Sequence, residues 1–371
     1  MKNIFPIVVP KWGLEMEEGR LNGWLVEEGG RVAKGDELAE IETSKVTNRL
    51  ESPYSGILRK KLAAIDRSYP CGTLIGVLAE PEVTESEIDA FVSDYRTAAV
   101  QRDESATEVR SEVLEIKGRT LRLLQLGEHP TRLLLIHGFG SGIDTWSAIQ
   151  DRLAQQYSTL ALDLPGHGGS SKDLAGIDSF ADLAALLQEV VQSRDYAPMH
   201  IVAHSMGVSV ALALAARAPD LVKTLTLISP AGLGSTPNPA FMQCLIGANS
   251  RKELGVALKM LFADQGYVTR EFVDAMLKYK RLDGVGTALQ KYASLLQSDS
   301  SNHADRLRGL SMPIQLIWGA QDEVIRPVEA ESLPANVGLA LFDSIGHVPQ
   351  VEASSRTLNR ILEFIGQSDR S

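Results

Sequence analysis

Residues 200–218, HIVAHSMGVSVALALAARA, decide the fold of most of this chain. Residues 200–203 are a short apolar run typical of a buried strand, and the alanine-rich stretch 208–218 has the composition of a helix. Ser205 stands between them, with an alanine two positions before it and a glycine two positions after it. Small neighbours are needed where a strand turns sharply into a helix, because larger side chains would collide with adjacent elements. The pattern predicts a turn that presents the Ser205 hydroxyl above a sheet.

The sequence on both sides of Ser205 continues this alternation of buried strands and helices. Apolar runs long enough for strands buried on both faces occur at residues 133–136, 159–162, 224–228 and 314–318. Such strands, alternating with helices, predict a mainly parallel sheet that helices cover on both faces. The interval of about 230–310 is too long for a simple crossover and has helical patterns of its own, so we expect an inserted helical cap there.

Three side chains of this part have the types and the order of a serine-dependent acyl-transfer site. A hydroxyl is a poor nucleophile near neutral pH, so Ser205 needs a base that an acid orients. Asp322 follows the apolar run 314–318, and His347 follows a glycine in a loop before the last helix pattern. Serine, aspartate and histidine in this order form the triad of sheets of this kind. The segment HGFG, residues 137–140, follows a strand and can present backbone N–H groups to an oxyanion.

These motifs make residues from about 113 to 371 similar to the α/β-hydrolase fold family. The strand before HGFG, the turn DLPGHG at residues 163–168 and the three triad positions occur in the family's order. The elbow begins with Ala203, where the family usually has glycine. The resemblance implies a catalytic set made of the nucleophile Ser205, the base His347, the acid Asp322, and an oxyanion hole formed by the backbone N–H groups of Phe139 and Met206.

Two other histidines, His167 and His204, are alternatives to His347 as the base. His167 stands between two glycines in a turn, and His204 directly precedes Ser205 at the elbow. Packing and hydrogen bonding within these turns are sufficient reasons for a histidine at either position. We therefore favour His347, which alone follows the aspartate in the order of the triad.

Residues 1–80 show a different pattern, which predicts an all-β domain. Short apolar runs are separated by turns rich in glycine and proline. Gly35 and Gly72, with several apolar positions, recur at one offset of 37 residues, which predicts two similar halves about a pseudo-twofold axis. Lys45 lies in ETSKVTN, residues 42–48, between two β runs. We expect its amine at an exposed hairpin tip, where the alternative interpretation is an ordinary surface lysine.

The same residues resemble the lipoyl-carrier domain family. The resemblance implies a flattened β-barrel of the lipoyl/biotinyl type, with lipoate attached covalently to Lys45. Biotin carriers of this fold normally place methionines beside the lysine, whereas Ser44 and Val46 flank it here. Asp66 stands where the second half of the repeat is expected to have glycine. The matching positions are residues 23–24, 29, 32, 35–36, 41–45, 52–56 and 72.

Residues 81–112 join the two parts and include three basic and nine acidic residues, with few large apolar side chains. Such a segment buries too little surface to offset the entropy of ordering, so we expect an acidic linker. Apolar and aromatic residues from Ile88 to Tyr95 have helical spacing, which allows a short helix within it. The predicted organisation is therefore a carrier domain at 1–80, this linker, and a catalytic domain at 113–371.

A lipoyl carrier joined to an α/β hydrolase is a specific combination. It is similar to the dihydrolipoyllysine-residue acetyltransferase family of bacterial acetoin-cleaving dehydrogenase systems. The resemblance implies acetyl transfer from the lipoyl arm on Lys45 to coenzyme A. It also implies three protein partners: a thiamine-diphosphate-dependent acetoin dehydrogenase component, dihydrolipoyl dehydrogenase and a lipoylating enzyme. Two alternatives stay open, namely a serine esterase or thioesterase, and a carrier whose hydrolase-like domain is a non-catalytic scaffold.

Composition and charge exclude several classes of partner and site for this protein. The net charge of −10 argues against a nucleic-acid binder, which needs a cationic face. No apolar run reaches the roughly 18 residues that span a bilayer. Two cysteines, far apart in the sequence, provide neither a disulfide framework nor a metal-ligand spacing. We therefore expect a cytoplasmic protein with no metal site and with neither nucleic acid nor a membrane as a partner.

Overall fold

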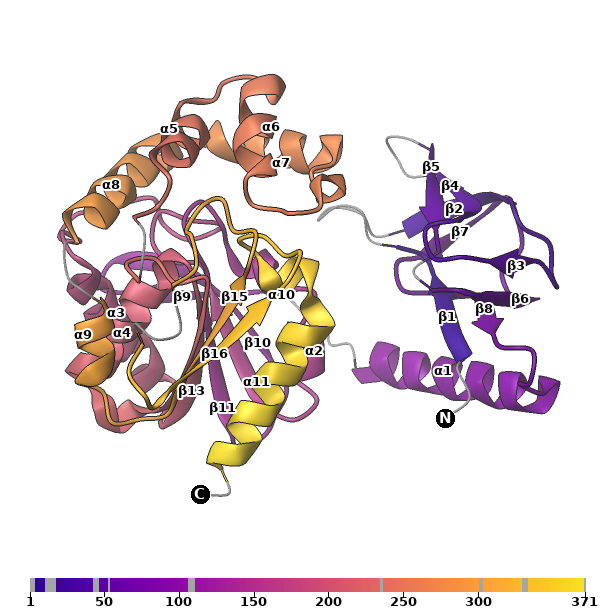
Figure 1. Cartoon of the computed structure of the whole chain (residues 1–371), viewed down its shortest axis with the longest axis horizontal. Coiled ribbons are helices and arrows are strands. Elements are labelled where there is room, and N and C mark those ends of the chain that lie inside the picture. The colour runs from indigo at the N-terminus through magenta and orange to yellow at the C-terminus, as the bar shows by residue number, and fades with distance from the viewer. Residues whose placement is uncertain are drawn as a thin grey trace. The chain divides into compact units, whose positions relative to one another are not determined.

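The structure is a computed structural model, and it divides the chain into two compact units, Met1–Glu108 and Val109–Ser371 (Figure 1). Within the part that it describes, no helix is long and apolar enough to cross a membrane, and no three His, Cys, Asp or Glu side chains gather to hold a metal ion. The described residues are 4–10, 18–42, 47–52, 54–105, 111–233, 236–299, 303–328 and 333–369.

The first unit is built from two four-stranded antiparallel sheets that enclose an apolar core. One sheet has the strand order β1-β8-β6-β3, and the other has the order β5-β4-β2-β7. Leu21, Leu38, Leu58 and Ile75 are almost completely buried between them. This arrangement confirms the predicted all-β class. The strands are β1 Ile4–Val8, β2 Glu18–Trp24, β3 Arg31–Val32, β4 Glu37–Glu42, β5 Thr47–Glu51, β6 Gly56–Lys61, β7 Arg67–Pro70 and β8 Leu74–Ala79.

The predicted 37-residue repeat is present in the strands. Strands β2, β3 and β4 recur at this offset as β6, β7 and β8, and the two sheets have equivalent strand orders. Gly35 and Gly72 have φ of 94° and 85°, so both halves use a left-handed turn residue at this position. Gly29 has φ 85°, and its counterpart Asp66 has φ 63°. Aspartate is one of the few residues that tolerate this region, which explains how the second turn forms without glycine.

A helix of 21 residues, α1 (Glu85–Ser105), occupies most of the segment 81–112. Its start is capped reciprocally, since Glu87 N–H donates to Thr84 Oγ1 at 3.3 Å and Thr84 N–H donates to Glu87 Oε2 at 2.8 Å. The helix is therefore longer than the short helix expected within an acidic linker.

One face of α1 packs against the strands of the first unit. Ile88 is fully buried and Val92 is 7% exposed, and both join Leu74 and Val77 of β8 in one apolar cluster. The acidic composition of the segment did not predict this burial of apolar side chains. Much of the expected linker is thus an ordered extension of the first unit.

The second unit has an eight-stranded sheet with the order β16-β15-β14-β13-β11-β12-β10-β9. The six strands β16, β15, β14, β13, β11 and β12 run parallel to one another. At one edge, β10 is antiparallel to β12, and β9 is antiparallel to β10. The strands are β9 Glu112–Ile116, β10 Arg119–Leu126, β11 Arg132–Ile136, β12 Ser158–Leu162, β13 Met199–His204, β14 Val222–Ile228, β15 Ile314–Gly319 and β16 Val337–Phe342.

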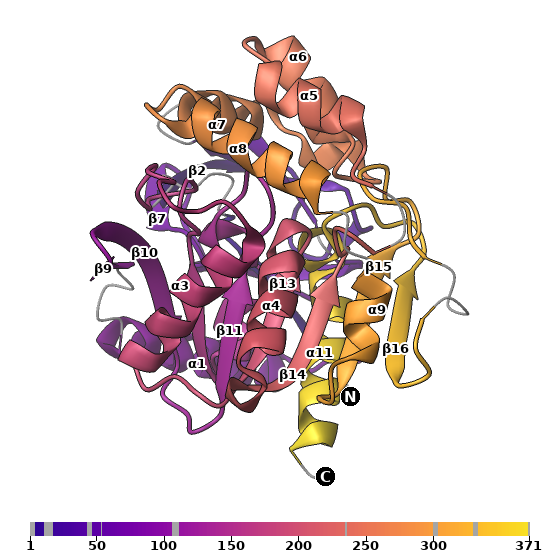
Figure 2. The same cartoon turned by 90° about the vertical axis from the view of Figure 1, so that its left-hand side faces the viewer.

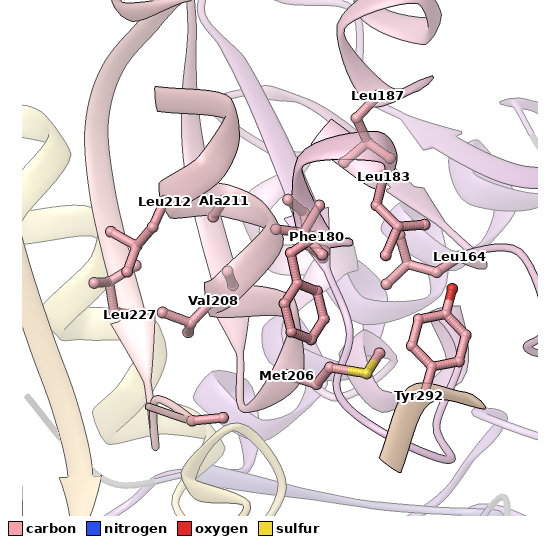
Figure 3. Packing of buried hydrophobic residues seen from close by; sticks show 14 of the residues in the cluster. Leu164, Phe180, Leu183, Leu187, Met206, Val208, Ala211, Leu212, Leu227 and Tyr292 are labelled. Atoms are coloured by element: carbon pink, nitrogen blue, oxygen red, sulfur yellow. The ribbon is translucent and has the colours of Figure 1, made fainter. Parts of the chain in front are cut away.

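Helices cover both faces of this sheet. Leu134 and Ile136 of β11 belong to the core cluster that includes α3 and α4, whereas Leu133 and Leu135 belong to the cluster that includes α11. Figure 3 shows part of the first cluster, to which Phe180, Leu183 and Leu187 of α3 and Met206, Val208 and Leu212 of α4 belong. The covering helices are α2 Gln150–Leu153, α3 Phe180–Ser193, α4 Met206–Arg217, α9 His303–Arg308, α10 Pro349–Glu352 and α11 Ser354–Ser368.

Four helices inserted between β14 and β15 form the cap that the sequence predicts. They gather at one end of the sheet (Figure 2). Tyr292 of α8 packs in the main core and donates its hydroxyl to the Pro165 carbonyl at 2.7 Å, which ties the cap to the turn after β12. The cap helices are α5 Pro239–Gly247, α6 Arg251–Lys259, α7 Arg270–Lys280 and α8 Val285–Ser298. The predicted α/β-hydrolase fold with a helical cap is confirmed.

Candidate active site

The strand β13 turns sharply into α4 at Ser205. Ser205 has φ 51° and ψ −119°, a backbone conformation that residues other than glycine rarely adopt. A Cβ atom on Gly207 would lie 2.5 Å from the backbone oxygen of His137, and one on Gly138 would lie 2.9 Å from Ser205 Cβ. These two positions must therefore be glycine, because the turn after β11 presses against the elbow. The strain at the elbow, roughly 1–3 kcal/mol, is typical of a functional position.

The side chains of Ser205, His347 and Asp322 form one hydrogen-bonded chain. His347 Nε2 lies 3.0 Å from Ser205 Oγ, and His347 Nδ1 lies 2.8 Å from Asp322 Oδ2. All three residues are at most 6% exposed. When Nδ1–H donates to the carboxylate, Nε2 of the neutral ring is left as an acceptor for the serine proton. The structure thus brings together the three residues that the sequence selects, in the geometry that proton removal from the hydroxyl requires.

Further hydrogen bonds hold the Asp322 carboxylate in place. Its Oδ1 accepts the N–H groups of Val324 at 2.9 Å and Ile325 at 2.8 Å. Its Oδ2 accepts the indole N–H of Trp318 at 3.0 Å in addition to the His347 contact. A buried carboxylate needs several donors to offset its loss of water. This set of donors also fixes the direction from which the carboxylate meets the imidazole.

The loop that bears His347 is fastened to the cap by a residue that sequence reasoning did not select. The carboxylate of Glu352 accepts the Gly346 N–H at 2.7 Å through Oε2. Through Oε1 it accepts both N–H groups of residues 263–264, at 2.8 and 3.0 Å. The His347 N–H in turn donates to the Leu261 carbonyl at 2.8 Å. Glu352 therefore bridges the loop and the segment that follows α6.

The predicted oxyanion hole consists of two backbone N–H groups, those of Phe139 and Met206, on the two turns that meet at the elbow. Met206 is the first residue of α4, so its N–H has no acceptor within the helix, and the positive end of the helix dipole lies there. Phe139 lies in the turn after β11, the strand that pairs with β13. The close approach of this turn to the elbow agrees with the predicted pairing of Phe139 and Met206. Their role as an oxyanion hole stays a prediction.

Two buried histidines hold turns together near this site. His137 Nε2 accepts the Leu164 N–H at 2.9 Å, and His167 Nε2 accepts the Gly140 N–H at 3.2 Å. The opposite ring nitrogens face the carbonyls of Gly138 and Pro165 respectively. Burial lowers the pKa of both imidazoles, which suits the neutral rings that accept at Nε2. Through these hydrogen bonds, both side chains join the turn at residues 163–168 to the turn that follows β11.

His204 lies beside the proposed base but in a different role. Its Nε2 faces the His347 backbone carbonyl at 2.9 Å, so this nitrogen is the donor, and the two rings lie 4.9 Å apart. Burial, and then the neighbouring His347, hold the pKa of His204 well below its usual value. His204 supports the position of His347, and only His347 contacts both Ser205 and Asp322.

The segment that bears Lys45 lies between two paired strand ends. Strands β4 and β5 are antiparallel neighbours, and Glu42 pairs with Thr47 at the end of their ladder. Lys45 lies outside the described residues, which omit 43–46. Attachment of lipoate there stays a prediction.

The chain is similar to two families along its length. The family described as alpha/beta hydrolase fold matches residues 131–353, and the family described as biotin-requiring enzyme matches residues 6–78. A dihydrolipoyllysine-residue acetyltransferase component of the acetoin cleaving system from Cupriavidus necator is 38% identical over 95% of this chain and 95% of its own length. The protein of the same description from Pseudomonas putida is 37% identical over 98% of this chain and 99% of its own.

Solved structures show the same fold for the second unit. A meta-cleavage product hydrolase from Pseudomonas fluorescens superposes with a TM-score of 0.63 over 69% of this chain and 98% of its own, at 19% sequence identity. At this identity the likeness concerns the fold alone. The long, nearly complete alignments above are those that relate both units together to one kind of protein.

Proposed function

This chain belongs to the family of dihydrolipoyllysine-residue acetyltransferase components of acetoin cleaving systems, and on that premise we propose that it moves an acetyl group from a lipoyl arm on Lys45 to coenzyme A at the Ser205 site. The observation that carries the proposal is the hydrogen-bonded chain from Ser205 through His347 to Asp322. Acyl transfer is the reaction that such a triad performs.

The first unit fits a lipoyl group on Lys45. The family described as biotin-requiring enzyme matches residues 6–78, and the antiparallel strands β4 and β5 that precede and follow residues 43–46 are paired up to Glu42 and Thr47. The bound group supplies a dithiol, one sulfur of which bears the acetyl group as a thioester. The carrier role also accounts for a small unit separate from the one that bears Ser205.

In the first half of the proposed reaction, Ser205 Oγ attacks the thioester carbonyl carbon. His347 Nε2 takes the hydroxyl proton, and Asp322 stabilises the imidazolium that forms. The backbone N–H groups of Phe139 and Met206 stabilise the negative oxygen. The carbon–sulfur bond then breaks, and His347 returns the proton to the leaving thiol. An acetyl ester on Ser205 remains.

In the second half, the thiol of coenzyme A replaces water as the acceptor. His347 takes the thiol proton while the sulfur attacks the ester carbonyl carbon. The bond from carbon to Ser205 Oγ breaks, and the proton returns to that oxygen. Acetyl coenzyme A leaves, and the site is restored without any oxidant or reductant. A water molecule in place of the thiol would make the same site an esterase or thioesterase.

The proposed cycle needs three further enzymes. A thiamine-diphosphate-dependent acetoin dehydrogenase component would load the acetyl group, and dihydrolipoyl dehydrogenase would reoxidise the dithiol. A lipoylating enzyme would modify Lys45. These partners rest on the family relationship, since the names of the relatives describe one component of a larger system.

One assay separates the proposal from its alternatives. Purified chain is supplied with acetyl coenzyme A and dihydrolipoamide, and the products are identified by mass spectrometry. We expect S-acetyl-dihydrolipoamide, formed in the reverse direction. Free acetate as the main product would mean a hydrolase. No turnover by well-folded protein would mean that the second unit is a scaffold. Ser205→Ala serves as the control for the site of reaction.

A further inference from the structure

Two leucines of the cap lie directly against the turn that follows β11, which is the turn predicted to bind the oxyanion. A Cβ atom on Gly140 would lie 3.0 Å from Leu245 Cδ2 and 3.9 Å from Leu289 Cδ2. Leu245 belongs to α5 and Leu289 to α8, and the two residues are 2% and 1% exposed. We propose that Leu245, supported by Leu289, limits the acyl group that Ser205 accepts to the size of acetyl, an inference that rests on the proposed function.

A short series of contacts joins Leu245 to the nucleophile. A Cβ on Gly138 would lie 2.9 Å from Ser205 Cβ, so the turn meets the elbow at this residue. Gly140, two residues later, lies against Leu245. Phe139, whose N–H is predicted to bind the oxyanion, stands between the two glycines. The turn 138–140 therefore has the nucleophile at one end and the cap leucine at the other.

The bonds of the reacting carbon decide which part of a substrate extends toward the cap. In the tetrahedral intermediate this carbon bears the Ser205 oxygen, the oxyanion, the acyl chain and the leaving sulfur. Ser205 reaches it from the end of the sheet, and the predicted donors Phe139 and Met206 hold the oxyanion. The acyl chain and the sulfur are left to extend toward the cap, whose helices gather at this end of the sheet (Figure 2). Leu245 is placed to border one of these two groups.

The packing of Leu245 favours the acyl chain as that group. The leaving sulfur belongs to a lipoyl or pantetheine arm, and each of these long chains needs a path to the outside of the protein. Leu245 is nearly fully buried and lies in the main core cluster with Phe241 and Met242 of the same helix. This side of the turn is therefore closed to a long arm, whereas the methyl group of an acetyl needs no such path.

The burial of the triad agrees with a small acyl group. Ser205 is 6% exposed and His347 is 2% exposed. A groove that holds a long acyl chain would run past the nucleophile and expose it to solvent. One methylene group more or less in an apolar pocket changes the relative rate by roughly 10- to 200-fold. A closed apolar wall beside the oxyanion turn is therefore sufficient to select acetyl over longer acyl groups.

The test compares Leu245→Ala with Leu254→Ala in the full chain. Both residues are buried leucines of the cap, and Leu254 of α6 is not among the side chains that lie against Gly140. The kcat/KM for hydrolysis of p-nitrophenyl acetate, butyrate and hexanoate is measured for each variant. The ratio between two esters does not depend on the fraction of folded protein, so it stays valid if Leu245→Ala is less stable.

We expect the unmodified chain to prefer acetate to hexanoate, and Leu245→Ala to lower this preference about tenfold or more, because the smaller side chain leaves room for additional methylene groups. Leu254→Ala should keep the preference of the unmodified chain, although it also truncates a buried leucine. Leu245→Met, which conserves the volume of the side chain, should keep it as well. An unchanged preference in Leu245→Ala would overturn the inference, and so would an equal change in Leu254→Ala.

Transfer of acetyl and butyryl from coenzyme A to dihydrolipoamide is measured in parallel, which separates the inference from the function on which it rests. A higher KM for either thiol substrate in Leu245→Ala, with an unchanged ester preference, would place the leaving arm beside Leu245 and overturn the inference. A relaxed ester preference without transfer to any thiol would keep the inference and refute the proposed function. No hydrolysis of any ester by the folded, unmodified chain would overturn both.

Discussion

Leu261 accepts a hydrogen bond of 2.8 Å from the backbone N–H of His347, so the proposed base is tied directly to the segment that follows the cap helix α6. Glu352 strengthens the same junction from the other side. Gly346 is needed there, because a Cβ on it would lie 2.7 Å from the Leu261 carbonyl oxygen. The position of the imidazole therefore depends on the cap as well as on the sheet.

Glu352→Gln should lower kcat by roughly 10- to 100-fold, because a small displacement of the base has this effect on a reaction that depends on alignment. The glutamine keeps the size of the side chain but places an N–H₂ group against backbone N–H donors. The KM for coenzyme A should change little, and the melting temperature should fall, because at least one backbone N–H loses its acceptor. Steady-state kinetics and a thermal scan check this, with Glu363→Gln on the exposed side of α11 as the matched control. A normal kcat would show that the junction does not position His347.

Ser205→Ala and His347→Ala should each lower kcat/KM for acetyl transfer by roughly 10⁴-fold or more, and the double variant should lose little more. The reason is that the nucleophile and its base act as one unit. Initial rates with acetyl coenzyme A and dihydrolipoamide measure the effect. Full activity of Ser205→Ala would mean that the incoming thiol attacks the thioester directly. Additive losses would mean that the two residues act in separate steps.

Stability should decrease as pH falls below about 6.5. Burial lowers the pKa of His137, His167 and His204, so these imidazoles stay neutral in the folded chain. The unfolded chain binds a proton on each of them below pH 6.5, and the free energy of unfolding therefore falls with pH by up to about 1.4 kcal/mol per unit and histidine. Urea unfolding at pH 7.5 and 5.5 measures this slope. His204→Asn should make the slope shallower, and an unchanged slope would contradict the assignment.

Most of the fold could be predicted from local pattern. The small residues around Ser205 encode the elbow, because they leave room for the neighbouring turn. Continuous apolar runs predict the central strands, because helices cover both faces of the parallel sheet and every side chain of such a strand is buried. The triad could be predicted as well, because Asp322 and His347 each follow a strand end in the family's order. The elbow and the strands depend on residues that are neighbours in the sequence, and the three site residues could be found from their order along the chain.

The parts that could not be predicted depend on contacts between distant residues. Strands β9 and β10 meet at Lys117 and Gly118, both with positive φ, and lysine is a weak signal for such a two-residue turn. The contacts of Glu352 reach residues 263–264, which no local motif reveals. Helix α1 follows the helical spacing at Ile88, but the acidic composition of the segment concealed that Ile88 and Val92 are buried against β8.

Lys45→Arg should abolish lipoylation and overall acetoin oxidation, because arginine keeps the charge but cannot form the amide. Acetyl transfer to free dihydrolipoamide should stay normal, since the Ser205 site lies in the other unit. Intact-mass spectrometry and the two assays check this. Lys34→Arg, an exposed lysine of the same unit, is the control and should be lipoylated normally. A lipoyl addition that survives in Lys45→Arg would move the attachment site elsewhere.

Ile88→Ala should detach α1 from the carrier unit. Ile88 is fully buried against β8, and truncation of such a side chain costs about 2–5 kcal/mol through lost contact and the cavity left behind. Hydrogen exchange of peptides that cover β8 and the start of α1 should become faster in the full chain. Ser93→Ala, an exposed change on the same helix, should alter stability by less than about 0.5 kcal/mol. If the coupled reaction also slows in Ile88→Ala, the docked helix contributes to delivery of the arm. Unchanged exchange in β8 would show that α1 adds nothing to the stability of the carrier.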